Sequence, residues 1–320
     1  MTVLITGAGL IGCHLANRIV NRGEKVVLYD LSPNREYIQK VAGKVNIEVV
    51  AADLRDLPAL INSLKQFSVD TLVHTAGLIG KRVAENSYTG ATNNILGTIN
   101  VLEAARLHGL RRLIYVSTFG VYDRSKMSGA SIREDAPLGG HNLYATTKLC
   151  SEHLFHAYSD LYKMDTVMIR PAGVFGKGHY VGGSTVGMTM RDLTLNLIKG
   201  NSFTIDAKIY PPNEYVYAKD VALALDLACQ ARDLKQRIYN AGSGVVTSTS
   251  DLAQIARQLA PKGEVQVVGS GSFDSHTVLP LDLSQSKAEL GYRPQFPMKE
   301  ALRDYMEILL EDGVPKPGRS

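Results

Sequence analysis

The stretch Thr6-Gly-Ala-Gly-Leu-Ile-Gly12 follows the apolar run Val3–Ile5 at the start of this 320-residue chain. In Gly-x-Gly-x-x-Gly spacing, the first glycine permits a tight turn, the second lets a pyrophosphate approach the backbone, and the third lets a helix pack against the strand. The helix expected over 10–22 points its N-terminus at the phosphates. We therefore predict a dinucleotide-binding turn rather than a glycine-rich turn without a ligand. The residues expected to contact the dinucleotide are Gly7, Gly9, Leu10, Ile11 and Gly12.

Asp30 stands at the end of the second expected strand, 18 residues after Gly12. A carboxylate at this place accepts hydrogen bonds from both ribose hydroxyls and repels a 2′-phosphate, so the sequence favours NAD over NADP. Arg35 lies close enough in the chain to reach such a phosphate, although a solvated charge at a helix start is the commoner role. NAD is the cofactor that we expect.

Short apolar runs alternate with helix-period segments along much of the chain. That alternation is the βαβ rhythm of a parallel, doubly wound sheet of the Rossmann type, an α/β fold. Asp56 before Leu57-Pro58, and Gly109 after His108, supply start and stop signals for two of the helices. The expected strands are Val3–Ile5, Lys25–Tyr29, Asn46–Val50, Thr71–His74, Arg112–Val116, Thr166–Ile169 and Arg237–Ala241.

The rhythm breaks after Pro171 and returns with an expected helix over 218–231 and the strand after it. The glycine-rich stretch 176–183 and the turn around Pro211 lie between these points. We therefore predict a second, smaller α/β lobe that is discontinuous in sequence. The predicted units are an NAD-binding domain of residues 1–175 and 218–247, a C-terminal substrate lobe of residues 176–217 and 248–312, and a fraying tail, 313–320.

The composition excludes several classes of protein. A net charge of +4, with 45% apolar and 21% charged residues, fits an ordinary globular protein, and no large basic cluster supports nucleic-acid binding. Three widely spaced cysteines, Cys13, Cys150 and Cys229, favour a reducing compartment, by default the cytoplasm. No apolar run approaches the about 18 residues of a membrane helix, and the early glycine motif leaves no room for a signal peptide. We expect no metal site.

Three Tyr-x-x-x-Lys pairs occur in the chain: Tyr122/Lys126, Tyr144/Lys148 and Tyr215/Lys219. The first lies in a loop, and the third crosses an expected strand-to-helix junction. Only Tyr144 and Lys148 open a long helix-period segment, 144–162, in which residues four apart share one face. We therefore assign the chemistry to this pair.

The residue types explain the chemistry that we expect. A phenol with a pKa near ~10 is a poor base, but a neighbouring ammonium and a nicotinamide positive charge favour phenolate. Tyr144 then exchanges a proton with a substrate hydroxyl, Lys148 holds the nicotinamide ribose, and Thr118, after the strand ending at Val116, hydrogen-bonds the reacting oxygen. Asn94 either orders the site through a backbone or water contact or is a solvent-facing helix amide.

These residues resemble the extended short-chain dehydrogenase/reductase family, also called the NAD-dependent epimerase/dehydratase superfamily. The resemblance implies a Rossmann domain, a small C-terminal substrate lobe, a role in carbohydrate metabolism and a homodimer built from two helices per subunit. The helix around Ile95, Ile99 and Leu102 is the first candidate interface, and the alternative for this stripe is the core, its commoner place. It adds the cofactor contacts Asp53 and Leu54, which are expected beside the adenine, and Ala76, Gly77, Asn94 and Pro171; Asp53 as a plain loop or cap residue is the alternative. The matching segments are Thr6–Gly12, Asp30, Asp53–Leu54, His74–Ala76, 94–98, Tyr115–Thr118, 144–148, Arg170–Pro171 and 215–220.

Departures from the family pattern bear on the substrate. Members that resemble nucleotide-sugar epimerases carry Asn where this chain has Gly173, Arg before the aromatic pair, where this chain has Asn213-Glu214, and an Arg-Pro-Gly-Asp-like run where it has Phe273-Asp-Ser-His-Thr-Val278. Dehydratases follow the active-site Thr with Asp-Glu, where this chain has Phe119-Gly120. We therefore expect a dehydrogenase/reductase acting on a secondary alcohol or ketone of a small polar or sugar-derived substrate. The alternatives are an NAD-retaining nucleotide-sugar 4-epimerase of the UDP-glucose type and a non-catalytic NAD-binding regulator. Arg191, His179, Lys81 and His276 are candidate anion contacts.

Overall fold

The structure is a computed structural model that describes residues 1–178, 183–259, 264–269 and 278–314. A seven-stranded sheet lies at the centre of the larger domain, in the order β10-β6-β5-β4-β1-β2-β3, and every neighbouring pair is parallel. Its strands are β1 (Thr2–Thr6), β2 (Lys25–Asp30), β3 (Ile47–Ala51), β4 (Thr71–His74), β5 (Arg112–Val116), β6 (Thr166–Pro171) and β10 (Ile238–Ala241).

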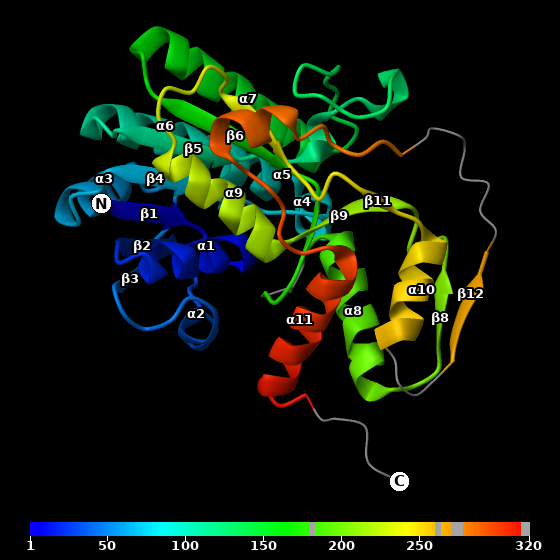
Figure 1. The fold of residues 1–320 in the computed structure, drawn as a ribbon. Helices are drawn as coiled ribbons and strands as arrows, with labels where there is room; N and C mark the ends of the chain where they lie inside the picture. The colour runs from blue at the N-terminus through cyan, green and yellow to red at the C-terminus, as the bar shows by residue number, and fades with distance from the viewer. Residues whose placement is uncertain (179–182, 260–263, 270–277, 315–320) are drawn as a thin grey trace.

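Helices cover both faces of this sheet (Figure 1). One face packs against α1 (Leu10–Asn21), α2 (Arg35–Val41) and α9 (Ala218–Gln230), and the other against α3 (Leu57–Gln66), α6 (Gly97–His108) and α7 (Leu143–Tyr162). Strand residues alternate between the two cores: Val3 and Ile5 join the first, and Leu4 joins the second. Both faces of a parallel sheet are buried, which explains why these strands read as continuous apolar runs.

The connections after β4 and β5 contain shorter helical pieces. These are α4 (Lys81–Glu85), α5 (Ser87–Ala91), the π-helical turn Thr92–Leu96, and the 3₁₀ turns Phe119–Val121 and Arg124–Lys126. A second π-helical turn, Ser286–Leu290, precedes the last helix. The strand order reverses between β1 and β4, and ligands of doubly wound sheets bind outside the carboxyl ends of the strands at such a point.

A smaller lobe lies beyond the carboxyl ends of β6 and β10 (Figure 1). It has a three-stranded sheet, β11-β9-β7, and a two-stranded sheet, β12-β8. A separate core joins Phe175, Tyr217 and Met190 to Leu252 and Leu302, which come from two distant stretches of the chain. The elements are β7 (Gly173–Phe175), α8 (Thr185–Lys199), β8 (Phe203–Asp206), β9 (Asn213–Tyr217), β11 (Val246–Thr247), α10 (Thr249–Leu259), β12 (Val265–Val268) and α11 (Met298–Glu311).

The structure confirms the predicted fold class and all seven strands, with small changes at their ends. Asn46 lies outside β3 because its backbone has a φ of 60°, a left-handed conformation that does not continue a strand. The Asp56 side chain caps α3 by accepting a hydrogen bond from the Ala59 N–H, as its position predicts. Gly109, at φ 71°, ends α6. Residues 315–320 of the predicted tail lie outside the described residues, and no described helix is long and apolar enough to cross a membrane.

Candidate active site

The glycine turn after β1 is held by its own backbone and leaves one face open. Gly7 has a φ of 90°, and a side chain there would lie 2.8 Å from Thr75 Oγ1. A Cβ on Gly12 would overlap the carbonyl oxygen of Gly7, so helix and turn touch directly. A Cβ on Gly9, by contrast, meets no atom within 4 Å. The space beside Gly9, at the N-terminus of α1, therefore fits the pyrophosphate of a dinucleotide.

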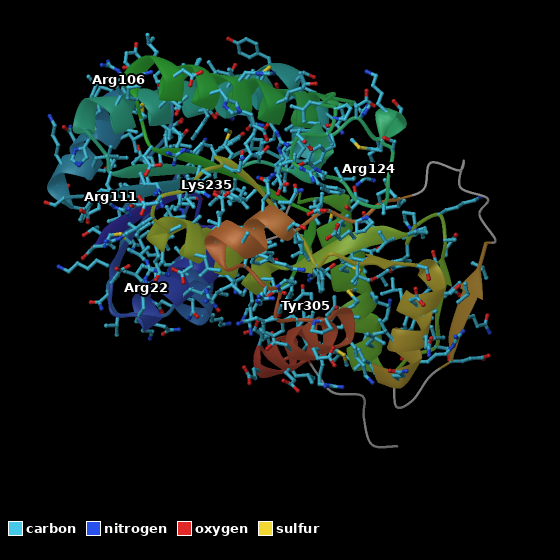
Figure 2. All side chains as sticks on the ribbon, turned by 45° about the horizontal axis from the view of Figure 1, so that its top comes forward. Arg22, Arg106, Arg111, Arg124, Lys235 and Tyr305 are labelled. Atoms are coloured by element: carbon cyan, nitrogen blue, oxygen red, sulfur yellow. The ribbon has the colours of Figure 1, made fainter. Side chains whose placement is uncertain are left out.

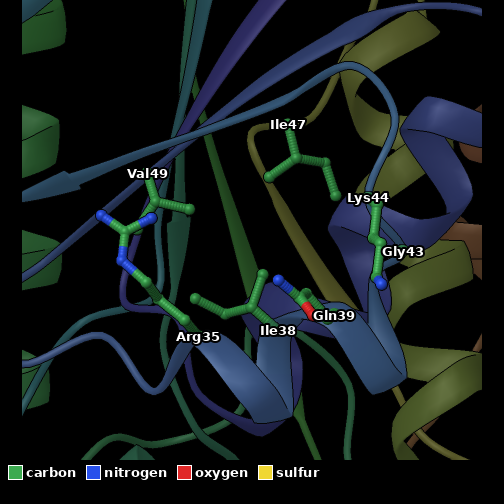
Figure 3. Close-up of a pocket in the computed structure, with 7 residues that line it drawn as sticks. All are labelled: Arg35, Ile38, Gln39, Gly43, Lys44, Ile47 and Val49. Atoms are coloured by element: carbon green, nitrogen blue, oxygen red, sulfur yellow. The ribbon is translucent and has the colours of Figure 1, made fainter.

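Asp30 ties the end of β2 to this turn. Its Oδ2 accepts a hydrogen bond from the Ala8 N–H at 2.8 Å, and its Oδ1 accepts one from the Ser32 N–H at 2.8 Å. Each carboxylate oxygen keeps a second lone pair, as ribose recognition requires. Arg35 points elsewhere: it lines a hollow with Val49 at the outer edge of the sheet (Figure 3).

The predicted adenine contacts lie at the end of β3. The Asp53 carboxylate is paired with Arg55 at 2.5 Å, and this contact lowers the pKa of the Asp53 carboxyl. The Tyr29 hydroxyl donates to the Asp53 carbonyl oxygen at 3.1 Å. The Leu54 carbonyl oxygen accepts a hydrogen bond from Asn100 Nδ2 on α6 at 2.8 Å. This loop is thus fixed through its backbone, and its role toward adenine stays a prediction.

Asn94 is a buried clamp on the loop after β4. Its Oδ1 accepts a hydrogen bond from the Leu78 N–H at 2.8 Å, and its Nδ2 donates to the Leu78 carbonyl oxygen at 3.0 Å and to Thr147 Oγ1 at 3.1 Å. The solvent-facing alternative for Asn94 is therefore wrong. Gly77 lies beside it: a Cβ there would be 3.3 Å from Asn94 Oδ1 and 3.9 Å from Lys148 Nζ. The clamp holds the Ala76–Leu78 backbone next to Lys148.

A chain of buried hydroxyls and one imidazole runs beneath the site, and sequence reasoning missed it as a unit. His74 Nδ1 lies 2.7 Å from Thr6 Oγ1, and its Nε2 lies 3.2 Å from Thr98 Oγ1, which is itself 3.2 Å from Ser151 Oγ. Burial lowers the pKa of His74 to about 3, so the ring is neutral and can both donate and accept. The chain links β1, β4, α6 and α7, the elements that carry the site. A histidine at the end of a buried strand was its only signal in the sequence.

Lys148 is a buried charged residue whose side chain reaches the carboxyl end of β5. Its Nζ donates to the Val116 carbonyl oxygen at 2.8 Å and lies 5.9 Å from the Tyr144 ring centroid. Burial lowers the pKa of Lys148 to about 8 and raises the pKa of the Tyr144 phenol. Thr118, two residues past Val116, accepts a hydrogen bond from the Gly120 N–H at 3.1 Å. Ser117 has a buried Oγ without a partner among the described residues.

The two other Tyr-x-x-x-Lys pairs make contacts that hold the fold together. Tyr122 is buried, and its hydroxyl donates to Asn240 Oδ1 at 2.6 Å, while the side chain of Lys126 is 67% exposed. Lys219 forms an ion pair with Asp304 on α11 at 2.7 Å. Of the three pairs, Tyr144 and Lys148 alone begin one helix at the carboxyl ends of the central strands.

The model of the NAD-dependent epimerase/dehydratase family matches residues 3–242. The chain belongs to this family. NAD is therefore its cofactor, and the expected resemblance to the extended short-chain dehydrogenases/reductases is confirmed. The enzyme class expected from the sequence, an NAD-dependent member of that family, holds as well.

Relatives and solved structures match nearly the whole chain. A UDP-glucose 4-epimerase of Mycolicibacterium smegmatis is 31% identical over 314 residues, which are 96% of this chain and 98% of the relative. The UDP-glucose 4-epimerase of Thermus thermophilus, solved with NAD, is 27% identical with a TM-score of 0.80, covering 97% and 99% of the two chains. That of Thermotoga maritima, at 21% identity, 98% and 99% coverage and a TM-score of 0.83, shares the fold. The names favour the epimerase alternative over the dehydrogenase that we expected.

Two of the three departures from the nucleotide-sugar pattern touch each other, and of the third, 273–278, only the last residue lies within the described part of the chain. A Cβ on Gly173 would lie 2.7 Å from Asn213 Nδ2 and 3.0 Å from the Glu214 carbonyl oxygen. Gly173 pairs with Tyr215 across β7 and β9, and Asn213 is buried. The Asn213 amide thus fills the place that a side chain at position 173 would occupy. Gly173 and Asn213, two of the departures from the family pattern, therefore form one contiguous patch in the smaller lobe.

Of the four candidate anion contacts, Arg191 lies exposed on α8, 3.9 Å from Asp192. His179, His276 and the side chain of Lys81 lie outside the described part of the chain. The three residues of the predicted interface differ in their exposure to solvent. Leu102 belongs to the core between α6 and the sheet, so its assignment to an interface is wrong, whereas Ile95 and Ile99 remain partly exposed.

Proposed function

We propose that this protein is an epimerase that retains NAD and inverts a secondary carbinol of a nucleoside-diphosphate sugar of the UDP-glucose type. The observation that carries the proposal is the position of Lys148. Its Nζ donates a hydrogen bond to the carbonyl oxygen of Val116, two residues before Thr118, and lies beside the Tyr144 ring. A full-length relative of 31% identity that bears this name supports the choice of reaction.

The catalytic roles follow from acid–base chemistry. Tyr144 takes the proton of the reacting hydroxyl and later returns it, and Thr118 donates a hydrogen bond to the same oxygen. Burial raises the pKa of the phenol, so phenolate needs the Lys148 ammonium nearby. The chemistry that bound NAD supplies is reversible uptake of the carbinol hydrogen as hydride, and its return to the opposite face of the ketone inverts the carbon.

The cofactor fits the chain's own residues. The open space beside Gly9 would hold the pyrophosphate, Asp30 the adenine-side ribose, and Lys148 the nicotinamide ribose. Of the other predicted contacts, Asp53 and Leu54 lie in the loop after β3, Ala76 and Gly77 lie in the loop after β4, and Pro171 ends β6, all at the same edge of the sheet.

One experiment tests the proposal directly. Purified protein should carry NAD in native mass spectrometry and should convert UDP-glucose or a related UDP-sugar into its 4-epimer without accumulating reduced nicotinamide. Inactivity toward every UDP-sugar offered, with NAD bound, would reject the epimerase. Tyr144→Phe is the matched inactive control, because it keeps the ring and removes the proton carrier.

A dehydrogenase remains the second candidate because of one observation, the neutral Gly173 and Asn213 patch. A patch without a cation suits a substrate without a diphosphate. Stoichiometric formation of NADH from a free sugar or sugar acid, with NAD added in excess, would establish this reading in place of the first.

We also propose a homodimer in which the π-helical turn Thr92–Leu96 and the start of α6 contribute to the interface. Ile95 and Ile99 are partly exposed, and Leu96 beside them is 40% exposed, so an apolar stripe faces outward. Sedimentation should give twice the chain mass, and Leu96→Glu should give the monomer. A monomeric unsubstituted protein would contradict the dimer.

A further inference from the structure

Arg124 lies six residues after Thr118, the proposed catalytic threonine. Its guanidinium forms no ion pair with another described residue. The residue begins the 3₁₀ turn Arg124–Lys126 in the connection between β5 and α7. Its guanidinium carbon lies 4.5 Å from the ring centroid of Phe119, in the stacked range of a cation–π contact. Phe119 follows Thr118 directly, so this contact brings the guanidinium into the neighbourhood of the proposed reacting oxygen.

The acids around Arg124 are engaged with other groups. Asp123 forms an ion pair with Lys126 at 2.9 Å and accepts a hydrogen bond from Ser125 Oγ at 2.6 Å. Glu214, whose charge acts on Arg124, places its two oxygens on the backbone N–H groups of Gly244 and Leu281, at 2.7 and 2.6 Å. Within the described ranges, no carboxylate is paired with the guanidinium.

The Arg124 side chain is accessible to solvent but partly surrounded by protein, and this burial lowers the pKa of the guanidinium. In Figure 2, Arg124 lies where the β5–α7 connection faces the smaller lobe. A planar guanidinium with five donors, accessible and without a carboxylate partner in the described part of the chain, matches a carboxylate, which it can bind through two parallel hydrogen bonds.

We propose that Arg124 binds a carboxylate of the substrate, so that the sugar is an acid. Two sources share this chemistry: a uronate within a nucleoside-diphosphate sugar, and a free sugar acid. The inference rests on the proposed function in one respect, the placement of the reacting carbinol beside Thr118. It goes further because it selects, among the sugars that the site could accept, those with a negative group on the Arg124 side.

The test compares acid and neutral substrates in Arg124→Gln, Arg124→Lys and a matched control, Arg133→Gln. Arg133 lies on the same connection, is 62% exposed and is paired with Asp135 at the surface. Two arms separate the sources: UDP-glucuronate against UDP-glucose, and glucuronate against glucose with NAD added. In the arm that the enzyme uses, Arg124→Gln should lower kcat/KM for the acid by about 10- to 100-fold, mainly through KM, and leave the neutral partner unchanged. Arg124→Lys should recover part of the loss, and Arg133→Gln should change nothing.

Calorimetry on NAD-loaded protein keeps this inference separate from the proposed reaction. Acid should bind more tightly than its neutral partner, and Arg124→Gln should abolish the difference. Equal binding of acid and neutral sugars, or equal losses on both in the variant, would overturn the role of Arg124. Acid-selective binding without turnover of any of the four sugars would instead reject the proposed reaction and keep the carboxylate site.

Discussion

The nucleotide end and the substrate end of the site are built in different ways. At the nucleotide end, the decisive contacts involve the backbone: the Gly7 N–H donates to the Tyr29 carbonyl oxygen at 2.8 Å, and the Ala8 N–H donates to Asp30. At the substrate end, they involve side chains, as where Asn213 fills the place beside Gly173. Backbone geometry tolerates little change, whereas side chains can be exchanged on a constant frame. The identity of the cofactor can therefore be inferred from this sequence more directly than the identity of the substrate.

Tyr144→Phe should have the largest effect, because it removes the hydroxyl of the proposed proton carrier. We expect turnover to fall by about 10²- to 10⁴-fold, the usual contribution of a positioned acid or base. NAD binding should survive, since the ring remains. Stopped assays with the NAD content measured on the same sample check both parts. Near-normal turnover would remove Tyr144 from the mechanism.

Gly12→Ala and Gly9→Ala form a matched pair that tests the backbone character of the nucleotide end. A Cβ at position 12 would overlap the Gly7 carbonyl oxygen, so this variant should lose about 1–3 kcal/mol of stability even without NAD. A Cβ at position 9 meets open space, so stability without NAD should not change. NAD affinity should fall in both variants. Thermal unfolding of NAD-free protein with and without added NAD measures the two effects, and equal destabilisation would contradict the geometry.

Asp30→Ala tests whether the one side chain that we assign to nucleotide choice acts as expected. Loss of the carboxylate should relax the preference for NAD over NADP by about 10- to 100-fold, because repulsion of the 2′-phosphate disappears. Asp30→Asn is the control that keeps an acceptor for the Ala8 N–H without the charge. If the ratio of the two affinities stays constant in both variants, Asp30 serves only to hold the turn.

Particular residues explain how far sequence reasoning reached. Strand alternation and glycine spacing are local signals, so the seven strands and the turn at Gly7 were predictable. Asn46 was misplaced in a strand because its φ of 60° leaves no mark in an apolar pattern. The π-helical turn at 92–96, which carries Asn94, was not predictable from the helical period of the sequence.

The substrate end was less predictable because its contacts join distant segments. Gly173 and Asn213 were both noticed as departures, but their contact depends on the parallel pairing of β7 with β9 across α8. The link from Thr6 to His74 likewise spans 68 residues. Arg124 was overlooked because a charged loop residue has no periodic signal, and its stacking on Phe119 appears only in three dimensions.

The pH dependence of turnover should report the ionisation of Lys148. Its pKa of about 8 means that the ammonium is present below pH 8 and is lost as the pH rises through that value. Because burial raises the pKa of the Tyr144 phenol, the active pair of phenolate and ammonium forms only after the site has lost one proton, so kcat/KM should rise by at most about tenfold per unit up to pH 8 and level off above it. Stability changes over a different range: an unfolded lysine stays protonated to about 10.5, so unfolding takes up a proton between pH 8 and that value, and stability rises with pH there. A pH–rate profile without a break near pH 8 would contradict this role.

The smallest expected effect tests whether Gly173 and Asn213 act as one unit. Gly173→Ala brings a methyl group against the Asn213 amide and the Glu214 carbonyl oxygen, so it should cost about 1–3 kcal/mol. In the Asn213→Ala background, the amide is gone and only the backbone contact remains, so the same substitution should cost less. Chemical unfolding of the four proteins in this double-mutant cycle should give a coupling of at least about 0.5 kcal/mol. Strictly additive free energies of unfolding would mean that Gly173 and Asn213 do not interact. The neutral patch would then no longer support a substrate without a diphosphate.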